Sequence, residues 1–301
     1  MVAINMIDIS GWQKGLDLKT VFNLNPELGG VIVKSSGGVS GVQETCDPWV
    51  QWLIKNNKPW GFYHFIHDDG KHSSGKAEAE FWVKNTKSYF GKGMPWADYE
   101  AQAANRGTAY LKEFLDTVYE LTGIKAGVYC SLSVVQSQDF NGIASFGYPL
   151  WVAQYADLNT VYGFLASPWQ RGSVAPFDRY VMHQYTSSGR LNGWGGRLYF
   201  VKYFGTAEDW ANMLGGSYVP GVSEDKPQLK GADPEIVKMV LNNEMGVGDE
   251  RIKNLKRAGY DPDSVQRKIN ELYSVAVKVK PLVEGNKAYL SLIAKIAKTM
   301  M

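Results

Sequence analysis

The chain has 301 residues, of which 45% are hydrophobic, 13% aromatic and 21% charged. This composition is typical of a globular protein with a sizeable core and excludes a disordered or fibrous chain. Thirty-two basic and 30 acidic side chains leave a formal charge of +2, far from the clustered positive excess of a nucleic-acid-binding protein, so we expect no nucleic-acid partner.

The sequence also bears on membranes, thiols and cofactors. No window approaches the roughly 18 consecutive apolar residues of a membrane span, and the first residues lack the basic and apolar regions of a secretory signal. We therefore expect no stable membrane association and a cytoplasmic chain. Cys46 and Cys130 stand alone, without a partner at metal-ligand spacing, which predicts two buried, reduced thiols. No phosphate-binding loop occurs, and we expect no cofactor.

Short apolar runs alternate with helix-like stretches over the first 200 residues or so. One such stretch, 108–121, has apolar residues at helical spacing and ends before Gly123. Strands that alternate with helices form a mainly parallel sheet, which predicts an α/β barrel with its functional side chains at the carboxyl ends of the strands. The predicted strands are 4–10, 30–34, 60–66, 95–100, 126–130, 149–155 and 180–185.

The aromatic residues indicate a domain boundary, because all ten tryptophans lie at or before Trp210. The residues that follow are rich in Gly, Pro, Ser and charge, which is typical of a linker. We predict a first domain over 1–214, a linker over 215–231 and a second domain over 232–301.

The second domain is predicted to be a small all-α module of three short helices. Asp233-Pro234 and Asp261-Pro262 each combine an N-cap with a proline at the first helical position. The helix between them runs from Asp249 to Gly259, and the apolar stripes include Ile252 and Leu272. This size suits a binding module better than an enzyme. A further stripe over 289–296 predicts one more helix, docked on its neighbours rather than lying on a membrane surface.

The sharpest local feature is a pair of carboxylates, Asp98 and Glu100, within an apolar run that begins at Trp96. On a strand, residues two apart point to the same face. If that face lines a barrel mouth, mutual repulsion keeps one acid protonated beside a charged carboxylate, as cleavage of a glycosidic bond requires. The alternative is an exposed edge strand with alternating acids, which Trp96 argues against. Asp8, at the end of the first strand, is a third candidate acid, or else a cap for the following turn.

Aromatic side chains at or near strand ends favour a sugar-binding site, because sugar rings stack on aromatic faces. From burial preferences we expect about half of them to be core residues only. They are Tyr63, Phe65, Tyr129, Trp151, Tyr155, Tyr185 and Trp194.

Three histidines, His64, His67 and His72, suggest zinc as an alternative. Their spacing matches no strong ligand pattern, and three ligands would require the polar loop that holds His72 to fold back. We therefore predict no metal. Catalysis by a serine or cysteine nucleophile has no better support, since the GxSxG motif is absent.

A set of ordered motifs resembles the family 25 glycoside hydrolase lysozymes, the muramidases of phage endolysins and bacterial autolysins. The resemblance covers about residues 1–210 and implies an irregular (β/α) TIM-like barrel in which Glu100 is the general acid, Asp98 assists it and Asp8 lines the same pocket. It also implies glycan contacts for Lys34, Gln154, Gln184 and the strand-end aromatics Tyr63, Phe65, Tyr129, Trp151, Tyr155 and Tyr185. The motifs are IDISGWQ (7–13), VIVKSSGG (31–38), GFYHF (61–65), WADYE (96–100), GVY (127–129), WVAQY (151–155) and QYTSSG (184–189).

One position departs from that family. Its members carry an acidic residue in the last strand segment, where this chain has Tyr199 within LYFV (198–201). The fourth pocket carboxylate is therefore expected to be missing, unless a register shift brings Asp178 or Asp209 to its place.

The second domain resembles the CW-seven cell-wall-binding repeat of phage lysins. The motifs are GVGDER (246–251), AGYD (258–261) and Val265-Gln266, and one copy covers 234–273. The resemblance implies a small helical bundle that binds peptidoglycan muropeptide.

Together these features predict an endolysin N-acetylmuramidase that hydrolyses the β-1,4 bond between N-acetylmuramic acid and N-acetylglucosamine in peptidoglycan glycan strands. Because no signal peptide is evident, the chain is expected to stay in the host cytoplasm until lysis and then to act on the wall. Two alternatives remain open: a catalytically silent wall-binding protein, suggested by Tyr199, and a zinc-dependent cell-wall amidase built on the three histidines.

Overall fold

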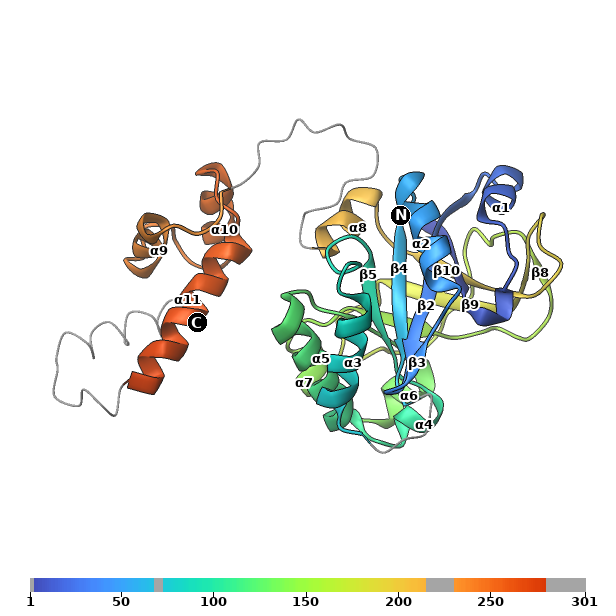
Figure 1. The fold of residues 1–301 in the computed structure, drawn as a ribbon, viewed down its shortest axis with the longest axis horizontal. Coiled ribbons are helices and arrows are strands. Elements are labelled where there is room, and N and C mark those ends of the chain that lie inside the picture. The colour runs from blue at the N-terminus through green and yellow to red at the C-terminus, as the bar shows by residue number, and fades with distance from the viewer. Residues whose placement is uncertain (1–2, 68–72, 215–229, 280–301) are drawn as a thin grey trace. The chain divides into compact units, whose positions relative to one another are not determined.

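The computed structural model describes residues 3–67, 73–214 and 230–279 (Figure 1). The chain divides into two compact units, Met1–Val222 and Ser223–Met301, each of which is described by itself. Most of the expected linker and all of the expected helix over 289–296 lie outside the described residues, so both stay predictions.

The first unit is an eight-stranded closed barrel. Seven strands run parallel, and β10 (Leu198–Tyr203) pairs antiparallel with both β9 and β1. Pairing of β1 with β2 completes the ring. The parallel strands are β1 (Ile4–Ile9), β2 (Leu28–Gly37), β4 (Trp60–Phe65), β5 (Met94–Asp98), β6 (Gly127–Ser131), β7 (Leu150–Ala153) and β9 (Met182–Arg190). Two short strands, β3 (Gly41–Val42) and β8 (Val161–Tyr162), pair with β2 and β9 outside the ring.

The predicted barrel is confirmed, and each predicted apolar run overlaps one parallel strand. The structure adds β10, which none of these runs included. Only residues 191–197 separate β9 from β10, too few for the crossover that a parallel neighbour needs. The last strand therefore returns antiparallel, and it begins at the rim where the parallel strands end.

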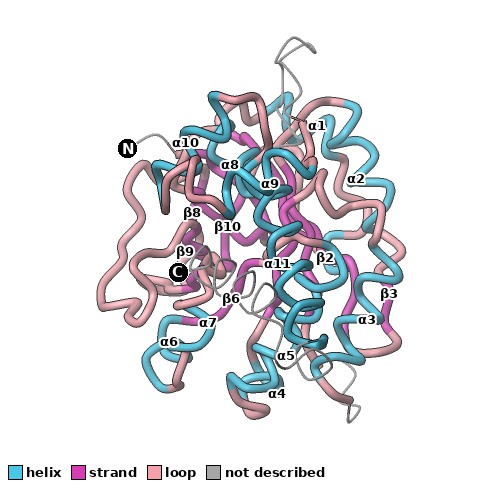
Figure 2. Tube along the Cα trace, turned by 90° about the vertical axis from the view of Figure 1, so that its left-hand side faces the viewer, coloured by secondary structure: helices cyan, strands magenta, loops and turns pink. Residues whose placement is uncertain are grey.

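Helices surround the strands, as Figure 2 shows for α1, α2 and α3. Their ends follow local chemistry: Asp17 and Ser74 cap α1 and α3, and Gly123 ends α5 with φ 71°. The predicted helix over 108–121 corresponds to α5. The helices and the 3-10 turn among the described residues of this unit are η1 (Gly11–Gln13), α1 (Leu18–Leu24), α2 (Cys46–Lys55), α3 (Gly75–Thr86), α4 (Ala101–Ala104), α5 (Thr108–Thr122), α6 (Leu132–Ser137), α7 (Asn141–Ala144) and α8 (Ala207–Met213).

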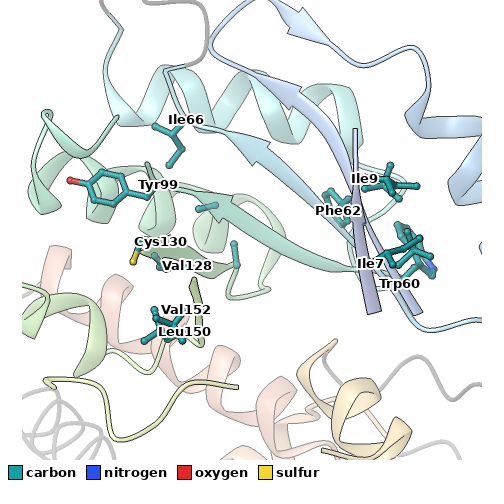
Figure 3. Close-up of a cluster of buried hydrophobic side chains, with 14 of the residues drawn as sticks. Ile7, Ile9, Trp60, Phe62, Ile66, Tyr99, Val128, Cys130, Leu150 and Val152 are labelled. Atoms are coloured by element: carbon teal, nitrogen blue, oxygen red, sulfur yellow. The ribbon is translucent and has the colours of Figure 1, made fainter. Parts of the chain in front are cut away.

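Strand alternation creates two apolar layers. The outward-facing side chains pack under the helices, and Figure 3 shows Ile7, Phe62, Val128 and Val152 among them. The inward-facing side chains fill the barrel and include Tyr63, Trp96, Tyr129 and Trp151. Both cysteines are buried and free, as expected.

The second unit contains α9 (Pro234–Leu241), α10 (Gly248–Arg257) and α11 (Pro262–Val279), which confirms the three predicted helices. Ile236, Val240, Leu255 and Ile269 are among its buried residues. Two expected core residues are not buried: Ile252 is 44% exposed and Leu272 is 38% exposed. A bundle of three helices encloses too little volume to cover every apolar side chain. No helix among the described residues is both long and apolar enough to cross a membrane.

Candidate active site

Three carboxylates lie at one rim of the barrel. Asp98 is the last residue of β5, Glu100 follows two residues later, and Asp8 is the next-to-last residue of β1. Because these strands are parallel, their carboxyl ends meet at the same rim. Asp98 follows Trp96 on the inner face, whereas Ala97 and Tyr99 belong to the outer layer. The structure thus gives Asp98 and Glu100 the shared inward face that strand alternation predicts.

Glu100 sits at a strained turn. It occupies the N-cap position of α4 in an extended conformation, and its side chain makes no capping hydrogen bond. The next residue, Ala101, has φ 48°, a left-handed conformation that costs a non-glycine residue about 1 kcal/mol or more. The backbone therefore ends β5 abruptly and leaves the Glu100 carboxyl available to a ligand.

Gln184 connects three residues of the site. Its Nε2 donates to Oδ2 of Asp8 at 3.0 Å, and its Oε1 accepts the hydroxyls of Tyr129, at 2.9 Å, and Tyr155. The side chain is 1% exposed, so this network is shielded from solvent and holds Asp8 in place. Oδ1 of Asp8 is buried and has no hydrogen-bond partner among the described residues, which leaves it available for a hydrogen bond with a substrate.

Burial and charge raise the pKa of two of these acids. Burial, together with the negative charge of Glu100, raises the pKa of Asp8 to about 8, against the opposing effects of Lys34 and the Gln184 hydrogen bond. Burial also raises the pKa of Glu100, and Lys34 again opposes the shift. The Lys34 ammonium lies 4.7 Å from the centroid of the Phe65 ring. The site therefore holds two acids with raised pKa values, Asp8 and Glu100, beside the positive charge of Lys34.

Tyr199 belongs to this site. It is the second residue of β10 and lies directly opposite Asp8 in the β1–β10 pair. Burial and the negative charges of Asp8, Glu100 and Asp98 raise the pKa of Tyr199. A register shift is wrong as an explanation: Asp209 closes a capping box with Thr206, and Asp178 lines a separate cavity beside Met94, the first residue of β5, at the amino end of the strands.

Most of the aromatic side chains expected to contact glycan lie on the inner face of the barrel. Tyr63, Tyr129 and Trp151 are buried on the inner face, with Phe65 and Tyr155 partly buried against them. The expected glycan contact of Tyr185 is wrong, because the structure does not bring this residue to the site.

Tyr185 follows Gln184 on β9 and therefore faces outward, where its hydroxyl accepts the Leu165 backbone N–H at 3.2 Å. Gln154, which was also expected to contact glycan, binds the protein backbone instead. Its Nε2 donates to the Arg171 carbonyl at 2.8 Å, and its Oε1 accepts the Arg171 N–H at 2.9 Å. Its side chain anchors a loop instead of facing substrate.

The histidines lie apart from the rim acids. His64 is fully buried on the outer face of β4, with Nδ1 2.8 Å from Oγ of Ser36 and Nε2 3.0 Å from Oε1 of Glu78. The Glu78 carboxylate also accepts the backbone N–H of His67 and the hydroxyl of Tyr110. His72 lies outside the described residues. Within the ranges that the structure covers, no group of three His, Cys, Asp or Glu residues could hold a metal ion.

Sequence reasoning assigned no role to the turn η1, although its residues stood in the first motif. Ser10 caps this turn through a capping box with Gln13, and Trp12 projects from it with 90% of its surface exposed. The sequence feature that could have pointed to this turn is the capping pair Ser10 and Gln13, directly after the Asp8 strand.

The second unit carries a groove of its own. The cavity measures about 400 Å³ and lies along α9 and α11. Val237, Leu241 and Leu272 supply apolar walls, and Lys238 and Lys268 supply positive charge. Exposed apolar side chains beside lysines suit a ligand with both apolar and anionic groups.

Comparison with known proteins agrees with both units. The family model described as "Glycosyl hydrolases family 25" matches residues 7–194, and the "CW_7 repeat" matches residues 234–273. The lysozyme of Streptococcus phage Cp-7 is 24% identical over 247 residues, which cover 78% of this chain and 61% of that protein. The chain thus spans less than two thirds of the length of this relative.

Solved structures show the same barrel. The catalytic domain of endolysin ply40 from bacteriophage P40 of Listeria monocytogenes is 25% identical, with a TM-score of 0.54 over 72% of this chain and 98% of that chain. The bacterial lysozyme from Streptomyces coelicolor is 18% identical, with a TM-score of 0.58 over 71% and 98% of the two chains. At that identity the second likeness shows the fold alone.

Proposed function

The chain belongs to the glycosyl hydrolases of family 25, and we propose on that basis that it is an endolysin muramidase. Its substrate is the β-1,4 bond between N-acetylmuramic acid and N-acetylglucosamine in bacterial peptidoglycan. The observation that carries the proposal is the gathering of Asp8, Asp98 and Glu100 on the inner rim, where burial raises the pKa of Asp8 and of Glu100.

In this proposal Glu100 protonates the leaving glycosidic oxygen. Burial raises the pKa of Glu100, which favours the protonated form that a general acid needs. Asp98 either orients the N-acetyl group of the substrate as an internal nucleophile or stabilises the cationic transition state. Asp8, held by Gln184 at 3.0 Å, makes a hydrogen bond with the sugar, and Lys34 and the inward aromatics contact the glycan.

The second unit, in the same proposal, binds cell-wall muropeptide in the groove along α9 and α11. The match to the CW_7 repeat over 234–273 supports this assignment. A catalytic domain linked to a wall-binding domain gains a high effective concentration on an insoluble substrate. Before lysis the protein resides in the host cytoplasm, and it acts once it reaches the wall.

The silent-protein alternative rests on Tyr199 alone. Tyr199 replaces one carboxylate, while Asp8, Asp98 and Glu100 remain together at the rim. Since one acid that stays protonated beside one charged carboxylate is the minimum for glycoside cleavage, the trio favours an active enzyme.

Mass spectrometry of digested peptidoglycan tests the proposal. The expected fragments carry new reducing ends on N-acetylmuramic acid. Release of free stem peptide would instead indicate an amidase, and intact strands would indicate a silent binder. Glu100→Gln is the matched inactive control in the same digest.

A further inference from the structure

A second cavity adjoins the acidic rim, and the proposed chemistry does not use it. It measures about 340 Å³, and its lining includes Trp12, Gln13, Trp194, Arg197 and Tyr199. Tyr199 lies opposite Asp8, so this cavity and the acidic site share a wall. The volume is in the range of small-molecule sites. We refer to these five residues as the Arg197 subsite.

A buried glutamine positions both sides of the Arg197 subsite. Nε2 of Gln13 donates to the carbonyl oxygen of Arg197 at 3.3 Å, and Oε1 of Gln13 accepts the backbone N–H of Ser10 at 2.9 Å. Gln13 itself is 5% exposed. This one side chain therefore connects the turn that carries Trp12 to the loop that carries Arg197.

Trp12 and Tyr199 of the subsite are exposed, whereas Trp194 is partly buried against the barrel core. Trp12 is 90% exposed, although a capping box fixes the N-terminal end of its turn. The indole of Trp194 lies close along the loop, because a Cβ at Gly196 would stand 2.6 Å from its Nε1. That Nε1 has no hydrogen-bond partner in the described part of the chain. Single exposed aromatics are ordinary, but here three aromatic residues border one cavity.

Arg197 supplies the charge. Its side chain is exposed, and across residues 3–67, 73–214 and 230–279 its guanidinium makes no ion pair or hydrogen bond. A guanidinium offers paired donors that match a carboxylate. The subsite therefore combines flat apolar faces with a cation that is available to an anionic group.

We propose, on the basis of the proposed function, that the Arg197 subsite binds the stem peptide carried by the glycan strand. Arg197 binds a peptide carboxylate, and Trp12 and Tyr199 contact the adjoining sugar and peptide surface. The enzyme thereby prefers strands whose peptides carry free carboxylates. The shared wall at Tyr199 places this peptide next to the cleaved bond.

The test uses the full chain and two soluble substrates of equal length. One is glycan bearing stem peptides with free carboxylates, and the other is the same material after those carboxylates have been converted to primary amides. We expect kcat/KM to be about five- to tenfold higher on the charged strands, the scale of a charge-assisted hydrogen bond near a surface. In Arg197→Gln this ratio falls to about one, Arg197→Lys keeps most of it, and added salt lowers it in the unchanged chain.

Arg179→Gln is the matched control, because Arg179 is also exposed but precedes β9 at the opposite rim. It should keep the preference. Equal cleavage of both strands by the unchanged chain, or a preference that survives in Arg197→Gln, would overturn the subsite alone. If the unchanged chain cleaves neither strand, the proposed muramidase function itself is contradicted.

Discussion

Asp8 and Tyr199 are direct partners across the antiparallel pair of β1 and β10. Directly opposed residues on an antiparallel pair project to the same face, so the tyrosine stands where a further carboxylate would repel Asp8. The phenol of Tyr199 is neutral, because burial and the nearby acids raise its pKa. A single substitution at Tyr199 can therefore change the pH dependence of the site.

Tyr199→Asp should move the alkaline limb of the pH–activity profile upward by about one pH unit. A new negative charge near Asp8 and Glu100 raises the pKa values of these acids, so the proton needed for catalysis is retained to higher pH. Tyr199→Asn, without the charge, should leave the limb in place. Tyr199 is 36% exposed, which gives an aspartate there access to water. A lower melting temperature of Tyr199→Asp with an unshifted alkaline limb would show that the role of Tyr199 is structural only.

Glu100→Gln should lower kcat/KM on glycan strands by about 10² to 10⁴, the usual contribution of a positioned general acid. Folding and wall binding should persist. Asp98→Asn should also be severely impaired, because the developing positive charge loses its neighbour. Glu113→Gln, an exposed position on α5, is the control. Near-normal turnover in Glu100→Gln would remove that residue from the mechanism.

Gln184→Met should impair both stability and activity. It removes the acceptor of the Tyr129 and Tyr155 hydroxyls and the donor to Asp8, at a cost of about 3 kcal/mol in the free energy of unfolding. Loss of the donor also raises the pKa of Asp8 further. Chemical denaturation and pH profiles measure the two effects. Gln51→Met, at an exposed position on α2, should change neither, and a stable, active Gln184→Met would contradict the network.

Glu78→Gln should destabilise the fold by about 3 kcal/mol, because it breaks a fully buried pair with His64. Burial by itself would raise the pKa of Glu78, but hydrogen bonds and charge from His64, with Tyr110 and the His67 N–H, hold the pKa below its ordinary value.

A carboxyl with a depressed pKa in the folded state stabilises the fold above its unfolded pKa, and this stability disappears as the pH falls through the folded value. Melting temperatures measured from pH 7 down to pH 3 should therefore converge for Glu78→Gln and the unchanged chain. Glu80→Gln, exposed on the same helix, should track the unchanged chain throughout. Parallel curves for Glu78→Gln would contradict a charged Glu78.

Separating the two units should separate cutting from wall binding. Residues 1–216 are expected to cleave soluble glycan as the full chain does but to clear whole cells poorly, since the effective concentration at the wall is lost. Residues 217–301 should bind walls without cutting them. Turbidity, sedimentation with walls and cleavage of soluble strands give the three readouts. Equal clearing by the short enzyme would argue against a wall-binding role for the second unit.

Local chemistry in the sequence was enough to predict much of this protein. Apolar runs marked the seven parallel strands, and strand periodicity placed Asp98 and Glu100 on one face without knowledge of any partner strand. Asp233-Pro234 marked the start of α9 because capping depends on adjacent residues only. The family resemblance added roles for residues, which periodicity alone does not assign.

Tertiary structure decided what depends on pairing between distant segments. Alternation required Gln184 and Tyr185 to face opposite ways, but only closure of the barrel determined that Gln184 points inward to Asp8 and Tyr185 outward. The antiparallel return of β10 placed Tyr199 beside Asp8, 191 positions away in sequence, in an arrangement set by strand register. Periodicity is a property of neighbouring residues, whereas strand register and barrel closure arise from packing between distant segments. Register and closure therefore decided which residues make up the site.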